Sequence, residues 1–226
     1  MRILVFSRTA GFRHAAIEPG IAAFERLAAE HGFQLDATED PAVFNAADLS
    51  TYDAVVFLLT TGDVLDSAQE AAFTAFIRAG GGFVGIHSAS DTEYDWPWYG
   101  GLVGAYFDGH PSNPNVRAGT LLVRATDHPA TAGLPNPWDR EDEWYQFRDG
   151  RAGLTVLLDV DETSYKQPDE QPAPEPRPIA WSHAYDGGRA FYTGLGHTAA
   201  SYDEPLFLAH VWGGLRFALG ETAEQD

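Results

Sequence analysis

Apolar residues in the first part of the chain form short continuous runs that alternate with stretches at helical spacing. The continuous runs are residues 3–6, 54–59 and 82–86. Such runs are typical of strands that are covered on both faces. The intervening spacing predicts a helix from Ile17 to Ala28, ending at Gly32, and another around Phe73 to Ile77, ending at Gly80. Repeated strand–helix units predict an α/β fold, a doubly wound and mostly parallel sheet with helices on both sides.

The second half of the chain is less regular. The expected strands are residues 121–124, 154–158, 179–184 and 189–193. The acidic and aromatic segment 139–145 is expected to lie in a loop between the first two of these strands. The turn residues 186–188 separate the last two strands and predict a C-terminal β-hairpin. A final helix is expected from about 203 to 217.

Composition limits the classes of protein to consider. With 226 residues, 44% of them hydrophobic, the chain can bury one sizeable core, and we expect one domain over 1–220 with a tail at 221–226. The net charge is −19 and Lys166 is the one lysine, so no basic stripe is present for nucleic acid. No segment approaches the about 18 apolar residues of a membrane span, and Met1 leads almost directly into the first strand. These features predict a cytoplasmic protein.

The segment from Gly82 to Ala89 predicts a strand that ends in a tight turn at His87. Small residues lie two positions before and two positions after His87, as a strand-to-helix elbow requires. The chain has no cysteine, which excludes thiolate chemistry. An imidazole presented at the mouth of a sheet indicates acid–base chemistry, ligand polarisation or metal binding.

In an open parallel sheet, ligands gather beyond the carboxyl ends of the strands. Polar residues follow the expected strand ends in the order His14, Thr61, Asp63, His87, Ser88, Asp91 and His197. We expect His14, His87 and His197 to surround one cleft, although each could instead fill a structural role in a cap, a core or a turn.

Other candidates lie in loops or on the expected elements. His110 and Glu143 are loop residues whose placement depends on the fold. Trp96 and Tyr99 belong to an aromatic segment after the elbow, where aromatic faces beside carboxylates could hold a sugar or simply pack under a loop. The other histidines are expected to be structural; they are His31, His128, His183 and His210.

Several motifs together resemble the ThuA-like family of trehalose-utilisation proteins. They are Thr9-Ala10-Gly11-Phe12-Arg13-His14, Thr60-Thr61-Gly62-Asp63, Gly81-Gly82-Phe83-Val84-Gly85-Ile86-His87, Asp142-Glu143-Trp144-Tyr145 and Tyr192-Thr193-Gly194-Leu195-Gly196-His197. The resemblance implies a flavodoxin-like fold similar to that of class I glutamine amidotransferases. Those enzymes keep a cysteine at the elbow, where this chain has His87, so amidotransferase activity is not implied. The resemblance also implies a carbohydrate substrate and an accompanying sugar dehydrogenase.

The leading hypothesis is an enzyme that acts on a disaccharide or keto-sugar with a histidine and a carboxylate as the proton-transfer pair. His87 would be the central group, with Glu143 or Asp91 exchanging or orienting protons and with His14 and His197 binding oxygen atoms. One alternative is a metal-dependent hydrolase, because three histidines and a carboxylate could hold a divalent ion. Another is a non-catalytic sugar-binding or accessory subunit of a dehydrogenase. The sequence does not fix the metal, the substrate or whether the chain forms a homo-oligomer.

Overall fold

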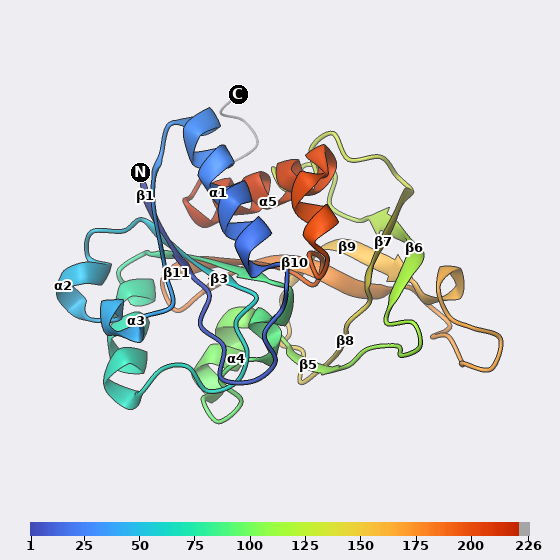
Figure 1. Cartoon of the computed structure of the whole chain (residues 1–226), viewed down its shortest axis with the longest axis horizontal. Coiled ribbons are helices and arrows are strands. Elements are labelled where there is room, and N and C mark those ends of the chain that lie inside the picture. Colours follow the sequence, from blue (N-terminus) through green and yellow to red (C-terminus); the bar gives the residue numbers. More distant parts are fainter. Residues whose placement is uncertain (222–226) are drawn as a thin grey trace.

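The computed structural model describes residues 1–221, and they form a nine-stranded sheet between two layers of helices (Figure 1). The strands are β1 (Arg2–Phe6), β2 (Gln34–Thr38), β3 (Ala54–Leu58), β4 (Gly82–Ile86), β6 (Val116–Val123), β7 (Trp138–Glu143), β9 (Thr155–Asp161), β10 (Arg177–Tyr185) and β11 (Gly188–Thr193). A separate pair contains β5 (Tyr106–Gly109) and β8 (Gln146–Arg148). The helices are α1 (Ile17–His31), α2 (Ala46–Leu49), α3 (Ser67–Arg78), α4 (Pro97–Val103) and α5 (Pro205–Ala218).

The large sheet has a parallel half and an antiparallel half. Its order is β2-β1-β3-β4-β11-β10-β9-β6-β7. Every pairing from β2 to β11 is parallel, and every pairing from β11 to β7 is antiparallel. β10 and β11 are joined through Asp186 and Gly187, which both have positive φ. The mixed α/β architecture with a large sheet agrees with the expectation from the hydrophobic pattern.

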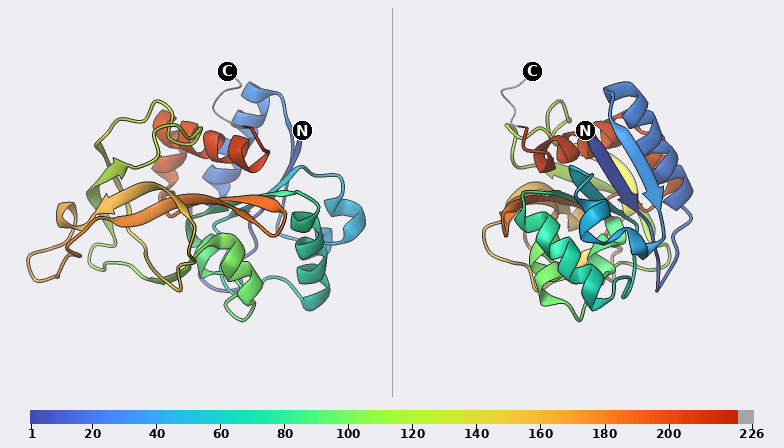
Figure 2. Two further views of the ribbon diagram at one scale, coloured as in Figure 1. Left: turned by 180° about the vertical axis from the view of Figure 1, so that it is seen from behind. Right: turned by 90° about the vertical axis from the view of Figure 1, so that its left-hand side faces the viewer.

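Helices cover both faces of the sheet, as Figure 2 shows in its right-hand view. Apolar residues of α1 and α5 pack in one core with one face of the strands, and those of α3 and α4 pack in a second core with the other face. α1 ends where Gly32 takes the left-handed conformation, with its N–H donating to Ala28 at 2.9 Å. Helices thus cover both faces of the sheet. The ends of its strands are left for loops and for a binding site.

The structure corrects part of the reading of the second half. The segment 139–145, expected as a loop, forms most of the edge strand β7 and the residues directly after it. Charged side chains at alternate exposed positions of this edge strand hide its β-character in the sequence, and they are usual on sheet edges. The tail expected at 221–226 lies outside the described residues apart from Glu221.

Irregular pairing bends the antiparallel half. The register between β10 and β9 shifts between Pro178 and Ala180 and again between Ala180 and Trp181. Bulges of this kind increase the local twist of a sheet. In Figure 1, β6 and β7 accordingly run across the direction of β10. Among the described residues, no helix combines the length and the apolar character that crossing a membrane requires.

The fully buried His210 on α5 gives a first prediction. Burial lowers the pKa of His210 to about 4, whereas an unfolded histidine has a pKa of about 6.5. As the pH falls from about 6.5 to 4, the unfolded chain takes up a proton that the folded chain refuses, so the free energy of unfolding should fall by about 1–3 kcal/mol from this residue. His210→Asn keeps a side-chain donor for the carbonyl of Ala130, 2.7 Å from Nδ1, and should lose that pH dependence.

Urea unfolding of both proteins at pH 7 and pH 4.5 checks this expectation. The loss of packing in the variant is the same at both pH values, so the difference between the two proteins should shrink on acidification. A difference that stays constant between the two pH values would show that His210 is not kept neutral by the fold.

Candidate active site

The turn after β4 holds His87 in a strained backbone conformation. His87 has a φ of 50°, which residues other than glycine adopt rarely. Gly85 makes room for this turn, because a Cβ there would lie 3.0 Å from the Tyr192 ring and 3.2 Å from the Cβ of Ala89. The Tyr192 hydroxyl donates to the carbonyl oxygen of His87 at 2.7 Å. The elbow therefore fixes His87, whose side chain is fully buried.

A backbone carbonyl sets the orientation of the His87 ring. Nδ1 lies 2.8 Å from the carbonyl oxygen of Gly194, just after β11. A carbonyl only accepts hydrogen bonds, so Nδ1 carries a proton. Nε2 is then a hydrogen-bond donor when the ring is doubly protonated, and it offers a lone pair when the ring is neutral. Nε2 lies 3.3 Å from Oε2 of Glu143 and 3.2 Å from Nδ1 of His197. The Tyr145 ring packs on His87 with 4.0 Å between ring centroids.

Three histidines and one carboxylate form a compact group, which we call the His/Glu cluster: His14, His87, Glu143 and His197. One ligand atom from each residue lies within 4.8 Å of the others. Nδ1 of His197 is 3.1 Å from Oε2 of Glu143. The ring centroids of the three histidines are 5.1 to 5.2 Å apart. The structure thus brings together the three histidines that follow separate strands, and it adds Glu143 from the end of β7.

Neighbours of Glu143 keep its carboxylate ionised. Asn115 donates to Oε1 at 2.6 Å, and Nδ1 of His110 lies 3.5 Å from the same oxygen. Burial alone would raise the pKa of Glu143, but the hydrogen bonds from His197, His87 and Asn115 outweigh burial and hold the pKa well below its usual range. The cluster therefore contains one fixed negative charge.

His14 is held in its neutral form. Burial, together with the neighbouring His87 and His197, lowers the pKa of His14 to about 3. Its Nδ1 lies 3.4 Å from the hydroxyl of Ser88, which leaves Nε2 available. A neutral imidazole with an available nitrogen is the form that binds a metal ion.

The buried carboxylate of Asp142 joins the strand that carries Glu143 to the loop that carries His197. Oδ1 accepts from the N–H groups of Glu143 at 2.9 Å and His197 at 3.1 Å. Oδ2 accepts from the N–H of Gly196 at 2.8 Å and from Arg140 at 3.0 Å. Asp142 has no exposed surface. It is therefore the residue that sets the distance between two members of the cluster.

A cavity of about 320 Å³ opens onto three members of the cluster, His14, Glu143 and His197, whereas the fully buried His87 does not line it. Its aromatic walls are Phe12, Phe107 and Tyr145, and its polar lining residues are His14, Asp91, His110, Asn115, Glu143 and His197. Phe12 is 67% exposed and packs edge-on against His14. Burial raises the pKa of Asp91, although the Tyr94 hydroxyl donates to its carboxylate at 2.7 Å and acts in the opposite direction. The volume lies in the range of small-molecule sites, about 300–1,000 Å³.

Two of the residues expected to bind substrate, Thr61 and Asp63, do not line the cavity. The Thr61 hydroxyl donates to the carbonyl of Phe12 at 2.8 Å and accepts from the N–H of Gly11, so it fastens the loop before His14. Asp63 lies outside the cavity, in a separate acidic group with Glu70 and Glu93.

The aromatic segment after the elbow also lies away from the cluster. Tyr99 belongs to α4 and is fully buried in the core, and its hydroxyl donates to the carbonyl of Ala89 at 2.7 Å. Trp96 stacks on Trp98 with 5.0 Å between centroids. Neither residue lines the cavity, because these rings fill the space between α4 and the sheet. The aromatic walls come instead from Phe12, Phe107 and Tyr145.

Sequence reasoning missed several residues that shape the site. Asn115 and Asp142 orient members of the cluster, and Phe12, Phe107 and Tyr145 form the aromatic walls of the cavity. Asn115 and Asp142 carry no local signal, because polar residues are common in loops and on edge strands. Phe12 did carry a local signal, because an aromatic residue in a loop of polar and small residues is not expected to pack in the core.

The donor set of the cluster fits a divalent metal ion. Imidazole nitrogens and a carboxylate oxygen are ligands that zinc and other first-row transition metals prefer. Ligands with bonds near 2.1 Å to one ion lie about 3.0–3.4 Å from each other in octahedral or tetrahedral geometry. The separations among His87 Nε2, His197 Nδ1 and Glu143 Oε2, 3.1 to 3.3 Å, match this spacing.

The fold and the site together define an α/β protein with a histidine-rich cleft at the carboxyl edge of its sheet. Residues 2–218 match the ThuA family, described as trehalose utilisation. The chain therefore belongs to the ThuA family, which confirms the resemblance seen in its motifs and places the chain in carbohydrate metabolism. It matches none of the curated proteins with which it was compared.

Solved structures share the fold. A ThuA-like protein from Bacteroides uniformis is 22% identical with a TM-score of 0.81, covering 98% of this chain and 92% of its own. A ThuA-like protein from Parabacteroides merdae is 20% identical with a TM-score of 0.80, covering 100% and 92%. A cytoplasmic protein from Salmonella typhimurium is 13% identical with a TM-score of 0.66, covering 98% and 100%. At these identities the likeness concerns the fold alone.

The buried position of Asp142 predicts a large loss of stability when its carboxylate is removed. Asp142→Ala leaves Arg140 and three backbone N–H groups without their acceptor, and the free energy of unfolding should fall by about 3–5 kcal/mol. Asp139→Ala is the matched control on the same strand, because Asp139 is exposed and binds only the Thr120 hydroxyl. Urea unfolding measures both variants. Similar small losses in the two variants would show that Asp142 does not hold the loop.

Proposed function

We propose that the protein is a metal-dependent enzyme that acts on a disaccharide or keto-sugar. The observation that carries the proposal is the convergence of four ligand atoms, from His14, His87, Glu143 and His197, within 4.8 Å. Each of the four comes from a different part of the chain, and each is buried or half-buried. A divalent ion held there would polarise a carbonyl group or lower the pKa of a water molecule.

Asp91 is the chain's own candidate for moving a proton beside that centre. It lines the cavity without belonging to the cluster. Partial burial raises its pKa, which makes the carboxylate a stronger base than one in water. The Tyr94 hydroxyl fixes its Oδ1. In a keto-sugar, the ketone acidifies the neighbouring C–H, and Asp91 would take that proton to give an enolate. Return of the proton to the former carbonyl carbon would give isomerisation. Breakage of the C1–O glycosidic bond, with the proton passed to the departing oxygen, would give elimination.

The walls of the cavity suit a sugar ring. The exposed face of Phe12 and the rings of Phe107 and Tyr145 offer apolar surfaces for the C–H face of a pyranose. Asn115, His110 and Asp91 offer hydrogen-bond partners for hydroxyl groups. Membership of a trehalose-utilisation family supports this class of substrate.

A second candidate is acid–base catalysis without a metal. Nδ1 of His197 lies close enough to both Glu143 Oε2 and His87 Nε2 for one proton on His197 to serve both acceptors. His87 and Glu143 would then form the proton-transfer pair. Metal content separates the two candidates, and the accessory-subunit hypothesis requires neither metal nor turnover.

The proposal extends to the fold. We propose that the parallel half of the sheet, with its elbow at His87, has the arrangement of class I glutamine amidotransferases. The strained residue directly after a buried central strand supports this assignment. His87 stands where those enzymes keep cysteine, so the elbow would present a ligand or base in place of a nucleophile.

The first test of the proposal is metal binding. Zn²⁺ titrated into metal-free protein should bind at one ion per chain. His87→Ala and Glu143→Gln should each weaken binding more than the about 10–100-fold that loss of a supporting hydrogen bond costs. His31→Gln is the matched control, because His31 lies on α1 against Trp212 and far from the cluster in the fold. Calorimetry measures affinity, and the d–d spectrum of bound Co²⁺ reports the number of ligands. Absence of stoichiometric binding of Zn²⁺, Co²⁺, Mn²⁺ or Fe²⁺ would leave the metal-free mechanism.

The second test concerns Asp91. Asp91→Asn should lower turnover of a 3-keto-glycoside by about 10²–10⁴ and leave metal content unchanged, because it removes a positioned base without touching a ligand. Asp95→Asn, at an exposed position that does not line the cavity, should behave like the unaltered protein. If the metal-loaded unaltered protein turns over neither keto-glycosides nor disaccharides but binds them, the accessory-subunit hypothesis replaces catalysis.

A further inference from the structure

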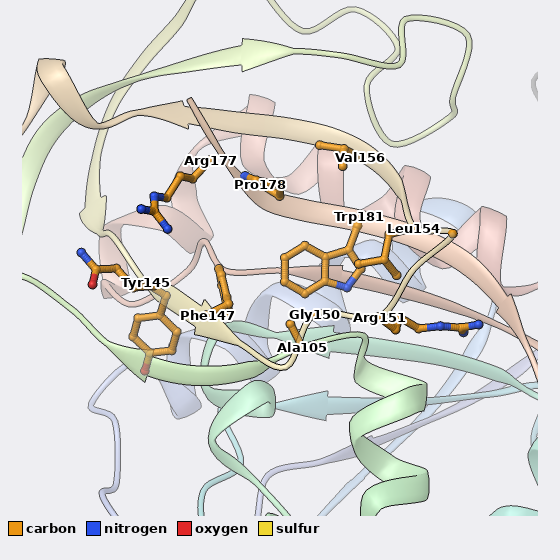
Figure 3. A pocket seen from close by; sticks show the side chains of 12 residues that line it. Ala105, Tyr145, Phe147, Gly150, Arg151, Leu154, Val156, Arg177, Pro178 and Trp181 are labelled. Carbon is orange, nitrogen blue, oxygen red and sulfur yellow. The ribbon is translucent and has the colours of Figure 1, made fainter. Parts of the chain in front are cut away.

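A second cavity, of about 370 Å³, shares the lining residue Tyr145 with the first. Figure 3 shows the side chains that line it. It lies between β8 with the loop that follows and the strands β9 and β10. Phe147, Leu154, Val156 and Trp181 form its apolar lining. Its volume falls within the range of small-molecule sites. The proposed sugar enzyme makes no use of this space.

Aromatic rings form the floor of the second cavity, and the one N–H group of the Trp181 indole already has a hydrogen-bond acceptor. The indole N–H of Trp181 donates to the carbonyl of Val103 at 2.8 Å. One side of the indole stacks on Tyr192, with 4.6 Å between centroids, and Phe147 packs against it edge-on at 5.0 Å. The surface that these rings present to the cavity therefore favours an apolar, flat ligand over a polyhydroxylated one.

Two arginines lie on either side of the apolar side chains in Figure 3. Arg177 is 3.2 Å from the carboxylate of Glu162, which offsets part of its charge. Arg151 lies over the Tyr185 ring at 5.0 Å and donates to the carbonyl of Ala184. Neither partner lines the cavity, and in Figure 3 the guanidinium points away from Trp181, so it lies at the rim of the cavity. Within residues 1–221, no carboxylate forms an ion pair with Arg151. In a chain with a net charge of −19, an arginine of this kind beside an apolar cavity is a local site for an anion.

We propose that this cavity is a second binding site, for a small aromatic anion such as an aryl carboxylate or sulfonate. The ring system would lie against Trp181, Phe147 and Leu154, and the acidic group would extend to the rim of the cavity, where it would bind Arg151. The proposal does not depend on the metal or on sugar turnover, since none of the lining residues belongs to the His/Glu cluster.

The probe for this site is 8-anilinonaphthalene-1-sulfonate, with the uncharged N-phenyl-1-naphthylamine for comparison. Fluorescence titration should show saturable binding of the sulfonate at one molecule per chain. Arg151→Gln should weaken sulfonate binding about 10-fold or more and leave the uncharged probe unaffected, because only the ion pair is lost. Leu154→Glu places a negative charge in the half-buried wall and should abolish sulfonate binding while weakening the uncharged probe.

Two control variants locate the bound probe. Arg148→Gln removes a nearby exposed arginine that packs over Tyr94 and does not line the cavity, and it should not change either titration. Phe12→Ala alters the neighbouring sugar cavity and should also have no effect. Near-UV circular dichroism identifies any variant that loses tertiary packing, and Arg151→Gln, on the surface, keeps the test valid if Leu154→Glu unfolds.

Three results would overturn the proposal. They are absence of saturable binding, equal weakening of both probes by Arg151→Gln, and loss of binding in Phe12→Ala with retention in Arg151→Gln. Self-association of the chain that excludes the probe would likewise assign the cavity to an interface between copies. None of these results would bear on the metal or on the turnover of a keto-sugar, so the two proposals fail separately.

Discussion

The site depends on one buried carboxylate, that of Asp142, which ties the edge strand β7 to the loop after β11. A carboxylate removed from water is stable only when its acceptor sites are filled, and here three backbone N–H groups and Arg140 fill them. Because two of those N–H groups belong to Glu143 and His197, the same bonds that compensate for burial also fix the spacing of two site residues. Asp142 therefore contributes to the stability of the fold and to the geometry of the site through the same hydrogen bonds. Movement of the loop after β11 would leave the buried carboxylate of Asp142 without some of its partners.

This tie is needed because the sheet order separates the residues that meet. β4, which carries His87 at its end, and β7, which ends at Glu143, are five strand-to-strand steps apart. In a flat sheet with strands about 4.8 Å apart, that is roughly 24 Å. The two side chains nevertheless lie 3.3 Å apart, so the antiparallel half must bend back over the carboxyl edge of the parallel half. The register shifts between β10 and β9, from Pro178 to Trp181, lie within the antiparallel half, and bulges of this kind increase the local twist of a sheet.

These distances explain what the sequence could and could not predict. His14, His87 and His197 follow buried strands of the parallel half, and parallel strands end at a common edge, so their proximity was predictable from pattern alone. Glu143 was identified as a candidate, but its strand was mistaken for a loop, since an edge strand with charges on its exposed face resembles one. Asn115 and Asp142 depend on the bend of the sheet, which no local pattern encodes. Trp96 and Tyr99 show the opposite error, because an aromatic segment near the elbow fits a sugar platform and a helix core equally well.

The strain at His87 is best understood together with the rest of the elbow. A non-glycine residue at positive φ costs about 1–3 kcal/mol and persists only where its surroundings over-determine it. Here the Tyr192 hydroxyl holds the carbonyl of His87, the carbonyl of Gly194 holds its ring, and Tyr145 packs on the ring. With Nδ1 engaged, Nε2 can point only toward Glu143 and His197, whatever occupies the space between them. The strained elbow thus fixes the direction of Nε2 of His87 before any ligand binds. A site that is fixed in this way needs little rearrangement when it binds a cation or a proton.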